Sequence, residues 1–287
     1  MRQRVLLLAS LGIFAAFFPA AVLAGETKID LPIVSQDEDH DGLSLQTEIL
    51  LGTNPQMADS DGDGLTDGEE FLYYGTNPLL LDSDQDGFND GDEIKNGFSP
   101  LAAGKKLKDQ DTDGDGLTDD LEIAFKTNPL IKDTDGDGYE DGREVESGYD
   151  PRDAKPTKLE KMITIHTVSQ KLRFYLGGVS IGEYLVSTGQ KKLPTPTGTF
   201  TIAKKSERVW SRLARLWMPW WMNLTGARAP AGLYAIHELP EWPNGVKEGE
   251  SHLGRPVSHG CVRLGIGPAK RLYDWTPVGT KVVISKD

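Results

Sequence analysis

Apolar and polar residues alternate along the C-terminal half of the chain, which is the pattern of half-buried β-strands. The alternation on both sides of Gly177 and Gly178, within residues 171–189, predicts a hairpin. Further strands are expected within residues 162–168, 195–205, 231–239, 261–266 and 279–285. Ala269, Leu272 and Trp275 recur at helical spacing, so residues 267–276 are predicted to form a short helix. The pattern indicates a mainly-β domain with one or few helices.

The N-terminal half has a different pattern, in which an acidic segment recurs five times and is followed each time by a short apolar stretch. The copies begin at Asp37, Asp59, Asp82, Asp111 and Asp133, so successive starts are 22, 23, 29 and 22 residues apart. A repeat this short has no room for two full helices around a loop. Each copy is therefore expected to form one loop and one short helix.

The acidic residues in each copy have the spacing of a calcium-binding loop. Carboxylates at loop positions 1, 3 and 5 converge on the cation, glycine at 6 permits the turn, and a glutamate at 12 closes the shell. Position 9 contributes directly or through water. The candidate ligands are Asp37, Asp39, Asp41 and Glu48; Asp59, Asp61, Asp63, Asp67 and Glu70; Asp82, Asp84, Asp86, Asp90 and Glu93; Asp111, Asp113, Asp115, Asp119 and Glu122; and Asp133, Asp135, Asp137, Asp141 and Glu144. The first copy has Leu45 at position 9 and is expected to be the weakest site.

Calcium suits these loops better than magnesium, because a cage rich in protein oxygens fits a larger, more flexible coordination shell. The alternative is a disordered acidic spacer. Glycine at position 6 and glutamate at position 12 in every copy favour the calcium loops. Without metal the acidic segment is expected to be extended, so the two alternatives can be two states of one segment.

The first residues of the chain predict export. Arg2 and Arg4 precede an apolar run over residues 5–18, and small residues lead to an expected cut after Ala24, which is the order of a secretory signal peptide. Residues 1–24 are assigned to this signal and residues 25–36 to a linker. The alternative is a membrane anchor, but the run is shorter than the ~20 residues that span a bilayer. We expect an exported bacterial protein of the periplasm or cell envelope, without a stable membrane anchor.

Charge divides the chain in two. From Lys158 onward lie 19 of the 31 Lys and Arg residues but only 9 of the 44 Asp and Glu residues. An acidic module, residues 37–151, is therefore joined through a linker, residues 152–160, to a basic module, residues 161–285. A basic domain in an exported chain is expected to meet an anionic envelope polymer, and nucleic acid is not an expected partner.

The basic module contains the only cysteine, Cys261, which cannot form an intrachain disulfide. A single cysteine in an exported chain suggests an intermolecular bridge or a reactive thiol, and the alternative is a buried structural thiol. A thiolate needs a base or a cationic neighbour, and His237 could reach Cys261 across neighbouring strands. A turn at Gly260 would expose the amides of Gly260 and Cys261 as oxyanion donors.

Two resemblances extend this interpretation. The acidic copies, from about Asp37 to Pro151, resemble thrombospondin type 3 repeats, which implies a calcium-stiffened arm. The segment "YAIHE" followed by "GRPVSHGCVRL" resembles the YkuD-type L,D-transpeptidase domain, whose signature falls on His237 and residues 258–263. One departure is Glu238, where many members have glycine, so the placement of the backbone carbonyl that orients the histidine is in question. The expected fold is a calcium-loop array followed by a mainly-β L,D-transpeptidase domain.

The second resemblance implies a function and roles for residues. Cys261 would attack the L,D-peptide bond of a peptidoglycan tetrapeptide stem, release D-alanine and pass the acyl group to an amine. His237 would be the base, and His259 and Gly260 would shape the oxyanion site. Arg263 would bind a stem carboxylate, with Ser258 and Tyr234 also on the substrate side. No cofactor is implied for the catalysis.

Three functional alternatives stay open. The acceptor is another stem, which gives a 3→3 crosslink, or an envelope protein. Transfer to water would instead make the domain an L,D-carboxypeptidase. The repeats could also belong to a calcium-dependent adhesion or binding protein. Residues 209–232, with four of the six tryptophans, are expected either to pack in the core beside a surface loop or to form a lid over the substrate.

Overall fold

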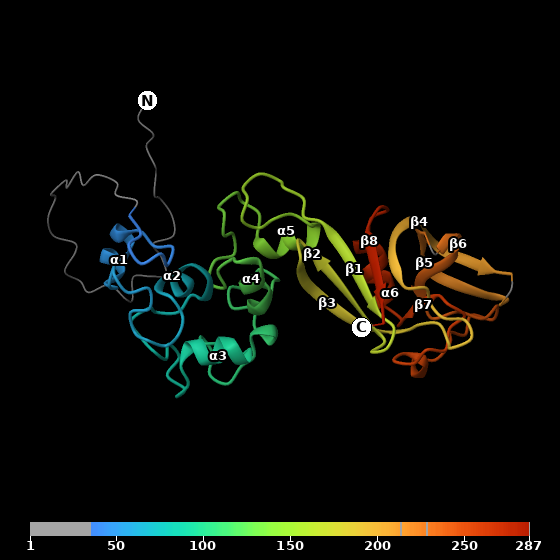
Figure 1. Cartoon of the computed structure of the whole chain (residues 1–287), viewed down its shortest axis with the longest axis horizontal. Coiled ribbons are helices and arrows are strands. Elements are labelled where there is room, and N and C mark those ends of the chain that lie inside the picture. The colour runs from blue at the N-terminus through green and yellow to red at the C-terminus, as the bar shows by residue number, and fades with distance from the viewer. Residues whose placement is uncertain (1–35, 213, 228, 287) are drawn as a thin grey trace, which may run out of the picture.

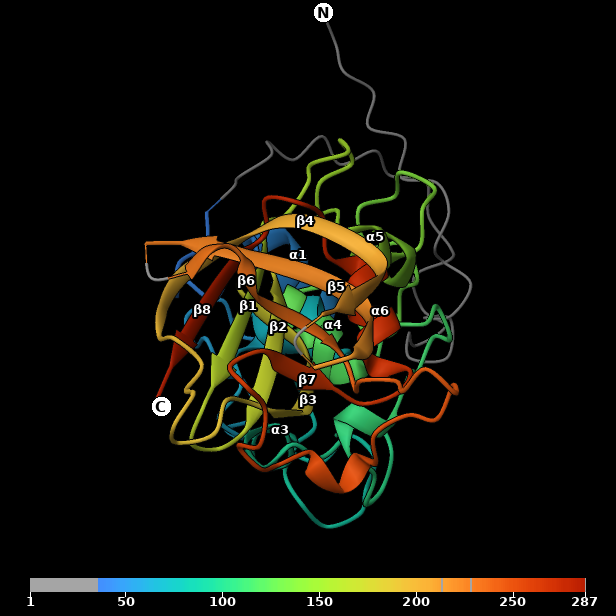
Figure 2. The same ribbon diagram turned by 90° about the vertical axis from the view of Figure 1, so that its right-hand side faces the viewer.

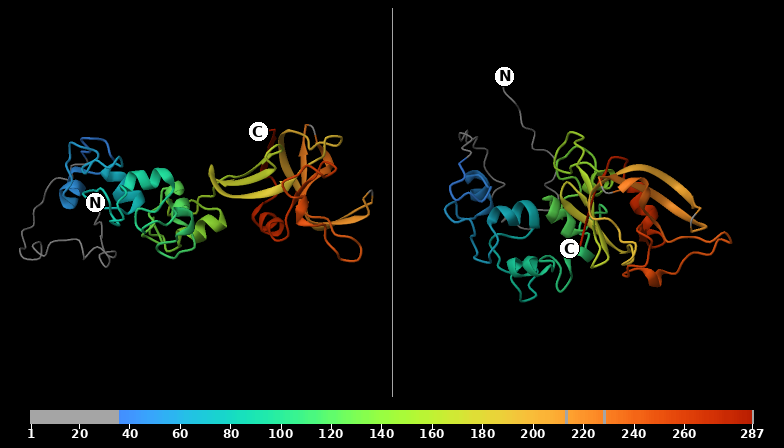
Figure 3. Two further views of the ribbon diagram at one scale, coloured as in Figure 1. Left: turned by 90° about the horizontal axis from the view of Figure 1, so that it is seen from below. Right: turned by 45° about the vertical axis from the view of Figure 1, so that its right-hand side comes forward.

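The computed structural model describes residues 36–212, 214–227 and 229–286, and it has the repeats at one end and a β-barrel at the other (Figure 1). The signal peptide expected over residues 1–24, and all but the last residue of the following linker, lie outside the described residues. Viewed from two further directions, the repeats form an arm that leads away from the barrel (Figure 3). Within the described residues, no helix is long and apolar enough to cross a membrane.

Each acidic copy forms one loop and one short helix, as the repeat length predicts. The helices are α1 (Leu45–Leu51), α2 (Asp67–Glu69), α3 (Asp90–Asn96), α4 (Asp119–Phe125) and α5 (Asp141–Ser147), and α2 continues as a wider helical turn over Glu70–Tyr74. All five repeat helices begin at loop position 9, and in every copy except the first this residue is an aspartate, which suits the positive end of a helix. Each repeat helix ends at a residue with positive φ, which is glycine in four copies and Lys126 in the other.

The longer step between the third and fourth copies forms a small insertion. A single backbone bridge joins Phe98 to Lys106, and a short 3₁₀ turn covers Leu107–Asp109. The side chain of Leu107 is buried. The insertion separates the third loop from the fourth in the sequence, while the second and fourth repeats are in contact, since Asn128 Nδ2 donates to the Phe71 carbonyl at 3.2 Å.

The C-terminal half is a closed eight-stranded barrel (Figure 2). Its strands are β1 (Lys161–His166), β2 (Lys171–Leu176), β3 (Val179–Ser187), β4 (Gly198–Ser211), β5 (Leu216–Gly226), β6 (Ala229–Glu238), β7 (Val262–Leu264) and β8 (Lys281–Ser285). The order around the barrel is β1-β2-β3-β7-β6-β5-β4-β8. The pairs β1·β8 and β6·β7 are parallel, and the other neighbours are antiparallel.

Aliphatic side chains from alternate strand positions fill the barrel. Ile163, Leu172, Ile236, Val262 and Leu264 are among the side chains with no exposed surface. Helix α6 (Pro268–Trp275) closes the core with Ala269 and Leu272, as the helical spacing predicts. The predicted hairpin is also present, as β2 and β3 joined through Gly177 and Gly178.

The tryptophan-rich segment is β-strand over most of its length. It contains the end of β4, all of β5 and the start of β6. The strand escaped sequence analysis because consecutive aromatics and Pro219 hide its alternation. The backbone of Trp217 also pairs with that of Glu241: the Trp217 N–H donates to the Glu241 carbonyl at 2.8 Å, and the Glu241 N–H donates to the Trp217 carbonyl at 2.9 Å. Met222 and Leu224 place part of β5 in the barrel core, as the core alternative expects. The described residues of the segment outside the strands are 212, 214, 215 and 227.

Candidate active site and calcium loops

Cys261 and His237 are brought together by the parallel pair β6·β7. His237 and Arg263 are register partners, and Cys261 precedes Arg263 by two residues, so all three side chains belong to one face of the two strands. The opposite face carries Ile236 and Val262 into the barrel core. The fold thus places the thiol diagonally across from the imidazole, on the outer face of the barrel.

The His237 side chain is buried and held in one tautomer. Its Nδ1 lies 2.5 Å from the backbone oxygen of Glu238. A carbonyl only accepts, so Nδ1 carries the proton and Nε2 keeps a free lone pair. Trp221 from β5 stacks on the imidazole, with ring centroids 5.5 Å apart. Burial lowers the pKa of His237 to about 4, so the ring is neutral near pH 7 and able to accept a proton.

The departure from the family pattern at Glu238 does not displace this carbonyl. The Glu238 side chain is buried, and its carboxylate pairs with the ammonium group of Lys247. Its backbone oxygen still faces His237. The larger side chain is therefore accommodated by its own ion pair.

The surroundings of the Cys261 thiol favour its protonated form. Burial raises its pKa, while a backbone hydrogen bond from Ala235 and the positive charge of Arg263 oppose that rise. With the lowered pKa of His237, these directions favour a neutral thiol and a neutral imidazole. A pair in these states would act by moving the proton during attack.

The residues before Cys261 form a tight turn. Gly260 has a φ of +111°, and a Cβ there would lie 2.7 Å from the Tyr234 ring, so only glycine fits. The buried Ser258 Oγ accepts the Gly260 N–H at 3.1 Å and donates to the Cys261 carbonyl at 2.5 Å. The Gly260 amide, expected as an oxyanion donor, is therefore engaged within the turn. His259 points away from the protein and is exposed.

Arg263 is already paired inside the protein. Its guanidinium lies 2.8 Å from the Glu248 carboxylate, whose other oxygen lies 3.2 Å from His252 Nδ1. The Arg263 and Glu248 side chains are only 11% and 14% exposed. Glu248 contacts Nη1, whereas the buried Nε has no hydrogen-bond partner among the described residues.

Three supporting residues were not identified from the sequence. Thr195 Oγ1 donates to the Gly260 carbonyl at 2.9 Å and accepts the Gly189 N–H at 2.8 Å, which ties the turn to the segment before β4. Glu248 holds Arg263, and Trp221 covers His237. Glu248 and Trp221 act across strand or loop contacts, so no local motif marks them. Thr195 lies in a recognisable turn, but its partner is 65 residues away.

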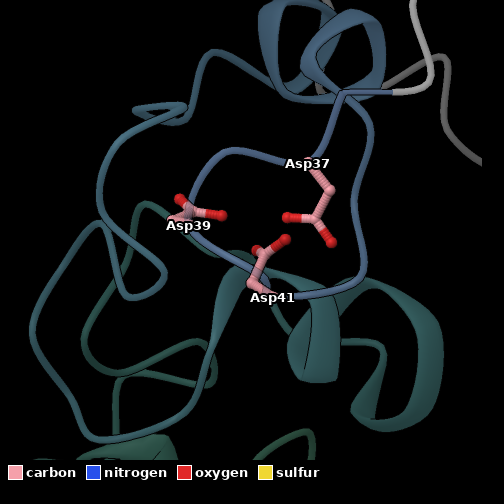
Figure 4. A group of neighbouring side chains, drawn as sticks. All are labelled: Asp37, Asp39 and Asp41. Atoms are coloured by element: carbon pink, nitrogen blue, oxygen red, sulfur yellow. The ribbon is translucent and has the colours of Figure 1, made fainter.

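The acidic loops share one internal geometry. In the second loop, Asp59 accepts the N–H groups of Gly62 and Gly64 at 2.7 and 3.1 Å, and Asp63 accepts that of Leu65 at 2.8 Å. Glycine at position 6 has a φ between +97° and +102° in all five copies, as the loop requires. In the first loop, the carboxylates of Asp37, Asp39 and Asp41 surround a common centre (Figure 4).

Buried carboxylate oxygens without partners mark the centre of every loop. Each of the five position-3 aspartates and position-12 glutamates has at least one such oxygen with no hydrogen-bond partner among the described residues. Burial, with neighbouring aspartates adding to it, raises the pKa of Glu70 and of Glu122 to about 9. Uncompensated buried carboxylates are costly, so the residues present fit a bound cation with oxygen ligands.

The position-9 aspartates also accept hydrogen bonds within their own loops. In the second, fourth and fifth copies, both oxygens accept hydrogen bonds from the residue at position 2; in the second, Asp67 binds the amide and hydroxyl of Ser60 at 2.8 and 2.6 Å. In the third copy, one oxygen of Asp90 accepts the Ser83 N–H at 2.8 Å, and the other has no hydrogen-bond partner among the described residues. Asp90 also groups with Asp63 and Glu70 of the preceding loop. Position 9 therefore stabilises its own loop in these four copies, and in the third it also lies beside the neighbouring loop.

This site defines the class of the C-terminal half: a barrel domain with a thiol beside a neutral, oriented imidazole, which is the arrangement of a cysteine-dependent acyl-transfer enzyme. Comparison with known proteins makes the class specific. Residues 160–284 match the model of the L,D-transpeptidase catalytic domain. Residues 59–80, 82–97, 111–130 and 133–154 match the bacterial TSP3 repeat. The first loop lies outside those matches, although its hydrogen bonds follow the same pattern.

Two relatives and one solved structure are similar to the C-terminal half of this chain. The chain is 28% identical over 145 residues to the putative L,D-transpeptidase YqjB of Bacillus subtilis, covering 48% of this chain and 78% of that protein. It is 30% identical over 129 residues to the putative L,D-transpeptidase YciB of Bacillus subtilis, covering 43% and 64%. An L,D-transpeptidase structure from Mycobacterium smegmatis is 24% identical with a TM-score of 0.37, covering 45% of this chain and 60% of that one. The chain thus spans less than two thirds of YciB and of that structure.

Proposed function

We propose that this chain is an exported, calcium-binding L,D-transpeptidase that acts on peptidoglycan stem peptides. The observation that carries the proposal is the pairing of Cys261 with His237 on one face of β6 and β7, with Nδ1 fixed by the Glu238 carbonyl. That arrangement leaves Nε2 as the only imidazole atom able to take the thiol proton. The family of residues 160–284 supports the choice of an L,D bond as the target.

The proposed reaction needs only these two groups and the substrate. The Cys261 thiol gives its proton to His237 Nε2, and the sulfur attacks the carbonyl carbon of the L,D-peptide bond. The C–N bond breaks, the proton passes from His237 to the departing D-alanine amine, and a thioester remains. An acceptor amine then attacks the thioester and gives a proton to His237. The C–S bond breaks, and His237 returns that proton to the sulfur, which restores the thiol and the neutral imidazole.

The residues around the pair are proposed to shape the site. The amide of Cys261 is the proposed oxyanion donor, because the Gly260 amide is engaged with Ser258 Oγ. His259 and Tyr234 are proposed to lie on the substrate side of the turn. The exposure of His259 supports its placement there. A stem carboxylate at Arg263 would share the guanidinium with Glu248, which pairs with Nη1. The charge of Arg263 also lowers the pKa of Cys261 and so favours the thiolate.

We propose calcium as the ion of the repeats. The supporting observation is the set of buried, unpartnered oxygens at positions 3 and 12 in all five loops. These oxygens, with positions 1 and 5, form a hard-ligand set of the kind calcium takes. The proposed role is structural, because the loops lie on the arm and not at Cys261. Calorimetric titration with calcium tests it.

Export to the bacterial envelope is proposed from the N-terminal sequence and the kind of substrate. Product analysis tests the catalytic assignment. Disaccharide-tetrapeptides incubated with the full chain should release D-alanine and give crosslinked dimers on mass spectrometry. Tripeptide products alone would instead support the carboxypeptidase alternative. Unchanged tetrapeptide would favour a binding protein.

A further inference from the structure

The last two repeats share an apolar core with the barrel. Leu117, Phe125 and Val145 from the repeats pack in one buried cluster with Leu176 from β2. All four side chains are at most 7% exposed, and Leu159, Val179, Ile181, Leu121 and Trp275 surround them. We call this cluster the seam. It belongs to neither half alone.

The seam residues and the proposed calcium ligands alternate along the same short segments. Leu117 holds position 7 of the fourth loop, and its N–H donates to Asp115 at 2.7 Å. Glu122, at position 12, lies between the seam residues Leu121 and Phe125 on α4. In the fifth copy, Val145 directly follows the position-12 glutamate on α5. The ligands therefore set where the seam side chains point.

The fourth and fifth loops are also joined to each other. The Gly142 N–H of the fifth loop donates to Asp115 of the fourth loop at 2.7 Å. Both carboxylate oxygens of buried Glu122 have no hydrogen-bond partner among the described residues. Without a cation, this concentration of negative charge opposes the close approach of α4 and α5 on which the seam depends.

The barrel side of the seam is built from β1, the β2–β3 hairpin and α6. Trp275, at the end of α6, contacts Phe174 of β2 with ring centroids 5.3 Å apart. Lys161 places its ammonium 4.7 Å from the Trp275 ring centroid and 3.1 Å from the Trp275 carbonyl. The same lysine packs against Gly148, which ends α5. The end of α5 and the end of α6 therefore meet at one side chain.

The first loops of the arm provide a natural contrast. The first helix, α1, lies at the end of the molecule away from the barrel, whereas α4 and α5 lie beside β2 and β3 (Figure 1). All five loops have the same unpartnered oxygens, yet only the fourth and fifth contribute side chains to the seam. A calcium ion has a different consequence at the two ends of the arm.

We infer that calcium in the fourth and fifth loops fastens the repeat array to the catalytic barrel. The partner of the surface formed by β2, β3 and α6 is the calcium-loaded pair of repeats from the same chain. Because the seam needs α4 and α5 in place, docking and calcium binding at these two loops strengthen each other. The inference rests on the proposed calcium sites, but not on the proposed reaction.

Tryptophan fluorescence of the full chain tests the inference, because all six tryptophans lie between Trp210 and Trp275 and none lies in the repeats. Adding calcium to the calcium-free protein should shift the emission to shorter wavelength and raise the melting temperature reported by the tryptophans. Glu122→Gln should raise the calcium concentration for half the response by roughly tenfold. The matched change Glu48→Gln, in the first loop, should leave it within about twofold.

Two further variants separate docking from metal binding. Val145→Ser should keep calcium uptake at the first three loops by calorimetry but lose the melting-temperature response of the barrel. Trp275→Phe should lose the emission shift and keep the melting-temperature response. The inference is overturned if calorimetry shows calcium binding while the tryptophan emission and the melting temperature stay unchanged. It is also overturned if Glu48→Gln and Glu122→Gln raise the calcium concentration for half the response equally. Calorimetry without any calcium uptake would overturn the calcium sites together with the inference, and leave the reaction to its own test.

Discussion

At the scale of single residues, His237 is the group on which the chemistry depends. Its ring is covered by Trp221, fixed by the Glu238 carbonyl, and neutral because it is buried. Sequence analysis found His237 and Cys261 because both lie in a recognisable motif. It did not find Trp221, Glu248 or Thr195, because their contacts join parts of the chain that only the closed barrel brings together.

The lowered pKa of His237 gives stability a defined pH dependence. An unfolded histidine takes up a proton near pH 6.5, whereas the folded His237 does so only near pH 4. Its contribution is therefore complete above pH 6.5 and is lost as the pH falls toward 4. In excess calcium, urea unfolding of the wild type should lose about 2 kcal/mol more than His237→Gln between pH 7 and pH 4.5. The exposed control His259→Gln should follow the wild type, and equal losses in all three proteins would contradict the account.

The Arg263–Glu248 pair predicts a large effect from a residue outside the motif. Glu248→Ala leaves a nearly buried guanidinium without its partner, so the free energy of unfolding should fall by roughly 2–3 kcal/mol. The exposed pair of Arg173 with Glu183 is the control, and Glu183→Ala should cost less than about 1 kcal/mol. Urea unfolding measures both. Similar costs for the two variants would show that Arg263 does not depend on Glu248.

At the scale of elements, hydrophobic patterning identified the β2–β3 hairpin and α6 well, because each has regular periodicity. It failed at β5, where Trp220 and Trp221 face opposite sides: Trp220 packs on Tyr273 of α6, and Trp221 stacks on His237. Trp220 also has a φ of +53°, which interrupts the regular pairing of β5 with β4. Aromatics buried on both faces conceal the alternation on which strand prediction relies.

The repeat helices are expected to depend on calcium. Helices α1, α3, α4 and α5 have seven residues each, which is too short for stability in isolation. Chelation should therefore remove most of their far-ultraviolet circular dichroism, and added calcium should restore it. Magnesium at the same concentration should restore much less, since it prefers to keep its water ligands. Unchanged helical signal after chelation would contradict a structural role for the ion.

At the scale of the whole molecule, an acidic arm is joined to a basic barrel. Charge and repeat spacing predict both modules from the sequence, but they predict only a linker between them and no contact. The seam could not be predicted, because its residues are ordinary apolar positions of α4, α5 and β2 that become partners only when the two halves meet. The barrel's closure by parallel pairs β1·β8 and β6·β7 was likewise beyond local patterning.

The central claim is that Cys261, activated by His237, forms a thioester with the stem peptide. Intact-protein mass spectrometry tests it most directly. The full chain mixed with a disaccharide-tetrapeptide should gain the mass of the substrate less D-alanine, and peptide mapping should place the adduct on Cys261. His237→Gln should form the adduct at least about a hundredfold more slowly, as expected when a general base is lost. Cys261→Ala should show neither adduct nor product, and product formation by that variant would contradict the account.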